Sequence, residues 1–184
     1  MKKLFLITCF LTTGITALFA QKYMTRTGKV KFDATAPSSP ERIVGVNNEA
    51  ACILDSKSGD VASQMLIKSF KFEKELMEEH FNENYMESDK LPKADFKGKI
   101  TNASEINFAK DGAYTAKVEG KLTIHGVTND VTTPADVTVR GHTVSVKTKF
   151  VVKLIDYKIK VPSLVADKLS KEATVTLDCD LTQK

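Results

Sequence analysis

Residues 144–154 read Val-Ser-Val-Lys-Thr-Lys-Phe-Val-Val-Lys-Leu, and this stretch decides the fold class. Its even-numbered positions form an almost wholly apolar row, whereas its odd-numbered positions are mainly serine and lysine. A period of two places alternate side chains on opposite faces of a β-strand, so that one face is dry and the other meets water. Strands of this kind are typical of antiparallel sheets, because the strands of parallel sheets are buried on both faces.

The same alternation recurs along most of the chain after residue 21. We expect further strands near 28–33, 43–55, 61–72, 94–101, 117–125, 132–140 and 173–181. Hairpin turns are predicted at 110–112 and 140–142, where glycine follows aspartate or arginine. Long one-faced strands without helices to cover a second face favour a sheet closed on itself. The prediction is an all-β, antiparallel barrel of about eight strands, with an interior either filled by side chains or open to one small ligand.

One segment breaks the alternation. Residues 73–81 place Leu76, Met77 and Phe81 at helical spacing opposite an acidic face, and Leu91-Pro92 prevents further extension. A short amphipathic helix between two barrel strands needs a dry surface, which we expect at the mouth of the barrel. Packing against the outer wall is the alternative.

Three glycines, Gly28, Gly98 and Gly120, fall on apolar faces of predicted strands. Glycine weakens a strand unless it permits a bend or leaves room. These positions therefore indicate barrel curvature, interior space or both.

The N-terminus has the pattern of an export signal. Lys2 and Lys3 precede an apolar run that ends at Ala20. We predict a signal peptide over residues 1–20, cleaved near Ala20, and a single domain over 21–184 in a periplasmic or secreted protein. An uncleaved membrane anchor is the alternative, although the apolar run is short for a span of about 20 residues.

Charge and cysteine content exclude several classes of function. The whole chain has 27 Lys+Arg and 23 Asp+Glu; the leader holds two of the lysines and no acid, which leaves 25 against 23. So balanced a chain has no electrostatic basis for binding nucleic acid. Cys52 and Cys179 remain after cleavage, either as two buried thiols or as one disulfide, and their spacing fits no metal motif.

Catalytic motifs are absent from the sequence. His80, His125 and His142 lie apart from one another at no metal-ligand spacing, and we expect them at the surface. His80 is the one that the helix could direct toward a ligand head group. There is no Gly-x-Ser-x-Gly turn and no glycine-rich phosphate loop. The sequence therefore predicts no enzyme, no metal site and no cofactor.

Two runs carry a resemblance to a known family. Residues 81–88 read Phe-Asn-Glu-Asn-Tyr-Met-Glu-Ser, and residues 120–128 read Gly-Lys-Leu-Thr-Ile-His-Gly-Val-Thr. With residues 28–32, 67–72 and 92–98 in the same order, the chain resembles the YceI-like family of envelope proteins. That resemblance implies a lipocalin-like barrel of eight strands that binds a polyisoprenoid or quinone-like lipid, with transient membrane contact.

The resemblance implies that the binding residues are apolar and lie in matching segments. The candidates are Phe32, Phe70, Phe72, Leu76, Phe81, Phe96, Leu122 and Phe150. We therefore expect an exported barrel that sequesters or carries an amphiphilic isoprenoid in its interior. The alternative is a barrel with a filled core that acts as a stress-linked protein-interaction module in the envelope.

Overall fold

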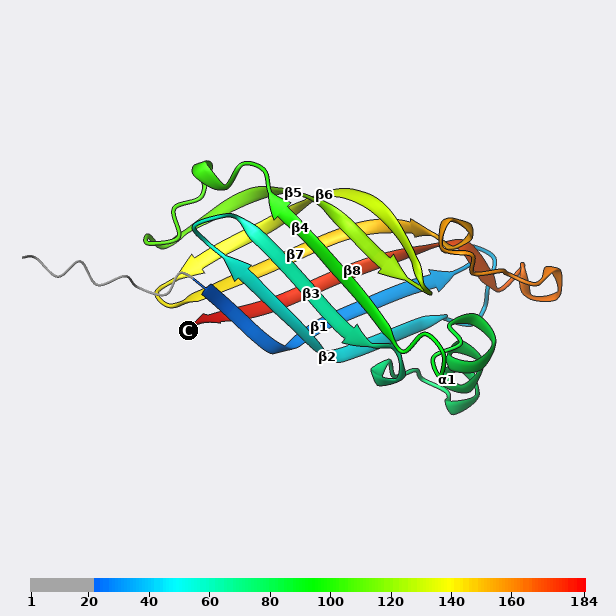
Figure 1. Ribbon diagram of the computed structural model, residues 1–184. Helices are drawn as coiled ribbons and strands as arrows, with labels where there is room; N and C mark the ends of the chain where they lie inside the picture. Colours follow the sequence, from blue (N-terminus) through cyan, green and yellow to red (C-terminus); the bar gives the residue numbers. More distant parts are fainter. Residues whose placement is uncertain (1–21) are drawn as a thin grey trace, which may run out of the picture.

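A computed structural model describes residues 22–184 as a closed antiparallel barrel whose eight strands follow one another in chain order (Figure 1). The strands are β1 (Lys22–Thr35), β2 (Val44–Asp55), β3 (Asp60–Leu66), β4 (Lys93–Ile100), β5 (Gly112–Ile124), β6 (Val127–Arg140), β7 (Thr143–Lys153) and β8 (Leu169–Gln183). The barrel closes where β8 pairs with β1. The predicted antiparallel barrel is confirmed, whereas the predicted signal peptide lies outside the described residues.

Short helical segments connect some of the strands. They are the 3₁₀ turns η1 (Ile67–Ser69), η3 (Ala103–Glu105), η4 (Leu154–Tyr157) and η5 (Ser163–Val165), the α-helix α1 (Glu75–His80) and the π-helical η2 (Phe81–Tyr85). The helix predicted over 73–81 is therefore confirmed in type, but its turns continue to Tyr85. Among residues 22–184, no helix has the length and hydropathy that a membrane span requires.

The strand predicted over 61–72 ends early, at Leu66. The chain there turns into η1, and Ile67 and Phe70 are both buried although they are three residues apart. A spacing of three matches one turn of 3₁₀ helix rather than the period of a strand. Phe72 follows after a single bridge between Lys71 and Val46 rather than within a strand.

The turn predicted at 110–112 is wrong, because β4 and β5 are joined by the longer segment 101–111. The buried Asn102 organises this segment: its side-chain nitrogen donates to the Thr115 carbonyl (3.0 Å), and its side-chain oxygen accepts from the Lys117 amide (2.8 Å). The hairpin predicted at 140–142 is confirmed, since β6 ends at Arg140 and β7 begins at Thr143.

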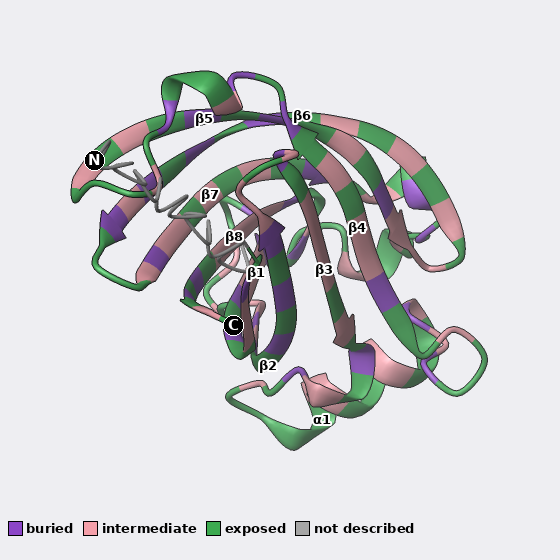
Figure 2. Cartoon of the chain, turned by 60° about the vertical axis from the view of Figure 1, so that its left-hand side comes forward, coloured by how far each residue is buried: buried purple, intermediate pink, exposed green. Residues whose placement is uncertain are grey.

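The two ends of the barrel differ. At the base, Tyr23, Ile100 and Ile106 are buried among the strand ends. At the other end, here called the mouth, lie α1, η2 and the long connection between β7 and β8 (Figure 1). Figure 2 shows buried and exposed bands alternating along the strands, as the period of two requires.

Candidate ligand cavity

A cavity of about 590 Å³ occupies the barrel and extends to its mouth. All eight strands contribute to its wall, which is mostly aliphatic and aromatic. This volume falls within the range of about 300–1,000 Å³ that is usual for small-molecule sites. The interior is therefore open rather than filled with side chains.

All eight residues proposed from the sequence lie on the cavity wall: Phe32, Phe70, Phe72, Leu76, Phe81, Phe96, Leu122 and Phe150. Whether they contact a ligand stays a prediction. Sequence reasoning missed smaller wall residues, including Val30, Val146, Val175 and Leu177. The period of two could have identified them. Val30 lies on the same strand face as Phe32, and Val146 on the same face as Phe150. Val175 and Leu177 are two residues apart on the apolar face of β8.

Four phenylalanines form one cluster where η2 meets the barrel. The Phe81 ring stacks on Phe32, with centroids 5.2 Å apart, and lies 5.6 Å from Phe70 and 4.9 Å from Phe72. Pairs of aromatic rings at such distances add about 0.5–1.5 kcal/mol each beyond the area that they bury. The cluster fastens the segment after α1 to the wall, at the mouth as the sequence predicted.

Leu76 is more exposed than the sequence predicted. It reaches the edge of the cavity but its side chain is 60% exposed, although the helical pattern placed it on the dry face. Met77 and Phe81 are half-buried and line the cavity. The helix α1 has only six residues, and Leu76 lies in its first turn. The barrel covers one side of the later turns, so Leu76 stays in contact with solvent.

The inward-facing glycines make room on the wall. Gly98 and Gly120 are paired across β4 and β5, and the Phe96 ring lies over both. A Cβ on Gly98 would fall 2.6 Å from this ring and 2.4 Å from the Glu119 carbonyl oxygen. The glycine pair thus lets a phenyl ring lie against the wall instead of across the cavity.

Gly28 makes room for the side chains of two cysteines. The sulfurs of Cys52 and Cys179 lie 2.8 Å apart, and a Cβ on Gly28 would fall 2.6 Å from the Cys179 Sγ. Both residues are buried free thiols on the cavity wall. Their mutual hydrogen bond and the burial raise the pKa of Cys179, so this thiol stays neutral.

In residues 22–184, the charged side chains that border the cavity all lie at its mouth. They are Glu41, Lys74 and Lys168, with His80 beside them; Lys74 forms an ion pair with Glu41. His80 lies on the cavity lining at the mouth, and a contact with a ligand head group stays a prediction. This arrangement offers polar contacts to one end of an otherwise apolar ligand.

His125 differs from the surface position expected of it, because its side chain is only 13% exposed. It sits in the β5–β6 turn with a positive φ of 50°, followed by Gly126 at 70°. Its Nδ1 lies 3.1 Å from the Tyr157 carbonyl oxygen, and its Nε2 lies 3.4 Å from a Glu87 carboxylate oxygen. His125 therefore connects three loops at the mouth, a structural role that the sequence did not reveal.

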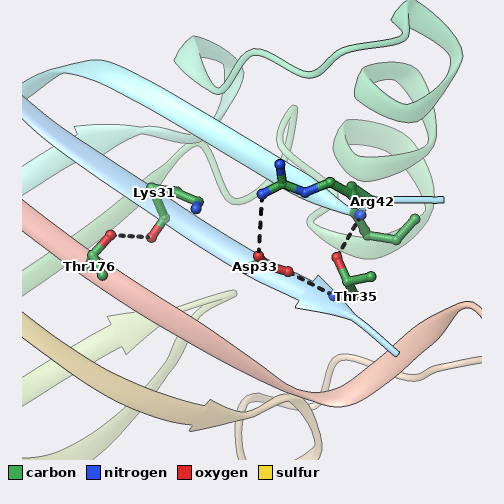
Figure 3. Close-up of polar contacts among 6 residues, drawn as sticks. Lys31, Asp33, Thr35, Arg42 and Thr176 are labelled. Carbon is green, nitrogen blue, oxygen red and sulfur yellow. Dashed lines mark hydrogen bonds and ion pairs between the residues drawn. The ribbon is translucent and has the colours of Figure 1, made fainter. Parts of the chain in front are cut away.

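The end of β1 is fixed by polar contacts outside the cavity (Figure 3). The Thr35 amide donates to Asp33 (3.1 Å), and the Arg42 guanidinium lies 4.0 Å from the same carboxylate. Partial burial acts to raise the pKa of Asp33, but the hydrogen bonds from Thr35 and the charges of Lys31 and Arg42 outweigh it and lower the pKa. These contacts hold the loop that carries Glu41 beside the mouth.

Within residues 22–184, no group of three or more histidine, cysteine or acidic side chains is arranged to hold a metal ion. The expectation that the protein needs no metal stays a prediction.

Comparison with known families agrees with this geometry. A model of the YceI-like domain matches residues 11–181. The chain belongs to the YceI-like domain family. Comparison with curated proteins gives no match.

Several solved structures share the YceI-like fold. A polyisoprenoid-binding domain from Saccharophagus degradans superposes with a TM-score of 0.76 at 14% identity, covering 90% of this chain and 99% of its own. BcnA from Burkholderia cenocepacia gives 0.68 at 17% identity, covering 85% and 96%. A Campylobacter jejuni YceI protein gives 0.57 at 16% identity, covering 76% and 84%. At these identities the likeness establishes the fold alone.

Proposed function

We propose that this protein is an exported carrier, not an enzyme, that holds an amphiphilic isoprenoid lipid, polyprenyl or quinone-like, in its barrel. One observation carries the proposal: an apolar cavity of about 590 Å³ whose charged lining residues, within the part of the chain that the structure describes, all lie at the mouth. A catalyst would need ionisable groups that converge on a reacting atom. The export signal predicted over residues 1–20 supports a periplasmic or secreted location.

The energetics favour a long apolar chain as cargo. Burying one methylene group stabilises a complex by about 0.8 kcal/mol, so a prenyl tail gains affinity without polar contacts inside the barrel. At the mouth, Lys74, Lys168 and His80 would face an anionic or polar head group. Such cargo resides in membranes, so loading and release require transient membrane contact.

The open cavity argues against the alternative of a filled-core interaction module. A filled barrel would place the large inward side chains in contact across the axis. Instead, Phe96, Phe150 and Leu177 are only partly buried while facing the interior. The relative from Saccharophagus degradans, which is described as polyisoprenoid binding, supports the same class of ligand.

The first experiment is native mass spectrometry of the protein purified gently from an envelope fraction, with solvent extraction of any adduct. We expect one apolar molecule per barrel. A clean apo mass that persists after incubation with detergent-solubilised polyprenols and quinones would sink the proposal.

A pair of variants on neighbouring residues locates the cargo. Phe150 lines the cavity, whereas Val151 points outward and is 58% exposed. Phe150→Glu buries a charge against the lipid tail and should abolish loading from detergent, while Val151→Glu should load like the wild type. Circular dichroism checks that both variants fold. If Phe150→Glu does not fold, the milder Phe150→Ser is used, for which we expect loading reduced at least about tenfold.

A further inference from the structure

We propose that the lysine-rich segment 153–171, which is the connection between β7 and β8 with the strand residues that flank it, is the surface that docks this protein on an anionic lipid bilayer. The inference rests on the proposed carrier function, because a lipid carrier must meet a membrane to load or deliver. It adds which side of the mouth makes that contact and which lipid charge the contact prefers.

The exposed large apolar side chains gather at one end of the barrel. Among residues 22–184 they are Ile53, Leu66, Leu76, Val151, Ile155 and Leu164. All except Ile53 belong to the mouth or to the strand end next to it. Leu164 is 92% exposed and Ile155 is 68% exposed, the two largest fractions of the set. Both lie in the connection 153–171, which projects beyond the end of the barrel (Figure 1).

The same connection has an excess of positive charge. Residues 153–171 contain five lysines and two aspartates; Lys153 and Lys171 lie at the adjoining strand ends and the other three lysines in the connection itself. In the described part of the chain, Lys153, Lys158, Lys160 and Lys171 form no ion pair. Exposed leucine and isoleucine flanked by such lysines match a bilayer surface, where apolar groups enter the interface and ammonium groups meet anionic head groups.

The opposite side of the mouth has the reverse character. Residues 73–89 contain seven acidic residues and one lysine. Three of these acids form ion pairs with lysines: Asp89 with Lys68 (2.5 Å), Glu78 with Lys71 (2.6 Å) and Glu87 with Lys90 (2.7 Å). Among residues 22–184, the other acids of this segment form no ion pair, and they are Glu73, Glu75, Glu79 and Glu83. An anionic surface would therefore repel the α1 side and attract the 153–171 side, which orients the barrel with this connection against the membrane.

The connection also leads into the cavity. Leu154 and Val165, the neighbours of Ile155 and Leu164, line the cavity wall. The turns are held by hydrogen bonds from the Ile159 amide to the Leu154 carbonyl (3.0 Å) and from the Lys168 amide to the Val165 carbonyl (3.0 Å). Alternate residues of one ordered segment thus face the solvent and the cavity, which gives a lipid tail a short apolar path between them.

The test measures binding of the full protein to phosphatidylcholine vesicles with and without phosphatidylglycerol, by flotation. We expect binding only to the anionic vesicles, weakened by added salt. Charge reversal with Lys158→Glu and Lys160→Glu should weaken binding more than about tenfold. Leu164→Asp should weaken it severalfold. The matched control, Lys57→Glu with Lys110→Glu, reverses two exposed lysines in base loops and should bind like the wild type.

Equal binding to both kinds of vesicle would overturn the proposal. So would unchanged binding by the double variant Lys158→Glu with Lys160→Glu and by Leu164→Asp. Absence of binding to either vesicle would also overturn it and leave the connection as a surface for a protein partner. Loading from detergent is measured in parallel with the same variants. In the wild type, docking that fails while loading persists refutes this inference alone, whereas loading that fails refutes the carrier function.

Discussion

Asp33 shows how single residues set the shape of the mouth. Its carboxylate accepts the Thr35 amide and faces Arg42, which fixes the turn from β1 into the loop at 36–43. Thr35 in turn accepts the Ile43 amide through its hydroxyl oxygen (2.9 Å). Both ends of the loop are thereby tied to the end of one strand, and the loop places Glu41 at the cavity edge.

The lowered pKa of Asp33 predicts a dependence of stability on pH. Its ordinary value is 3.8, and the folded value lies below this. The unfolded chain therefore binds the proton more readily, so the stabilisation is present above the ordinary value and is lost as pH falls through the folded pKa. We expect Asp33→Asn to reduce the free energy of unfolding at neutral pH, with the difference from wild type shrinking between about pH 4 and pH 2.

Denaturant unfolding across this pH range measures the effect. The control is Asp136→Asn, because Asp136 is exposed on the outer wall and has no ion pair within residues 22–184. A deficit in Asp33→Asn that stays constant with pH would contradict the assignment.

At the scale of elements, α1 and η2 act as one segment fastened mainly at its end. No residue of α1 is buried, whereas Phe81 enters the aromatic cluster and Met86, just after η2, is 5% exposed. The π-helical turn widens the backbone here, as the Met86 amide bonds the Phe81 carbonyl (2.9 Å). A segment with few buried contacts along its length opens more readily than the strands do.

Phe81→Ala should release this segment without unfolding the barrel. The variant loses three ring contacts of a half-buried side chain, for which we expect about 2 kcal/mol of destabilisation. Hydrogen exchange should rise over residues 75–88, and bound lipid should leave several times faster. Leu76→Ala, at an exposed position of the same segment, is the control. Unchanged hydrogen exchange over residues 75–88 in Phe81→Ala would show that the aromatic cluster does not hold this segment against the barrel.

At the scale of the whole molecule, stability and capacity compete for the same interior. The base is closed by buried residues such as Tyr23 and Ile100, and the small residues Ala116 and Ala135, paired across β5 and β6, are buried as well. Above them the wall residues leave the cavity open. The barrel thus keeps a packed base for stability and an open upper part for a ligand.

Filling the upper part should separate these two properties. Val175 lines the cavity and is paired with Phe32 on one side and Phe150 on the other. Val175→Trp would occupy the space between them, so we expect lipid loading to fall at least about tenfold, while the thermal unfolding midpoint changes by only a few degrees. Isothermal titration with detergent-solubilised quinone and a thermal melt check the two effects. Unimpaired loading would mean that the ligand lies elsewhere.

Much of this architecture follows from local pattern. The alternation along 144–154 and its repeats determines strand positions, and it also determines which faces of those strands are dry, because a strand has a period of two whatever its partners are. Four of the apolar residues proposed from the sequence lie on strands and accordingly line the cavity: Phe32, Phe96, Leu122 and Phe150. The other four reach the cavity from the segment between β3 and β4, which alternation does not describe. The exceptions are informative: Ile67 and Phe70 are apolar enough for a strand, but the chain turns between them.

Other features depend on residues that are far apart in the chain, and only the tertiary structure decides them. Cys52 and Cys179 meet over Gly28 because β1 lies between β2 and β8. His125 becomes mostly covered because loops from three parts of the chain converge at the mouth. Leu76 remains exposed because the mouth offers only a limited dry surface. The sequence by itself determined the barrel and its apolar lining; the open volume, its polar mouth and the exposed lysine-rich connection arise from contacts that local periodicity does not encode.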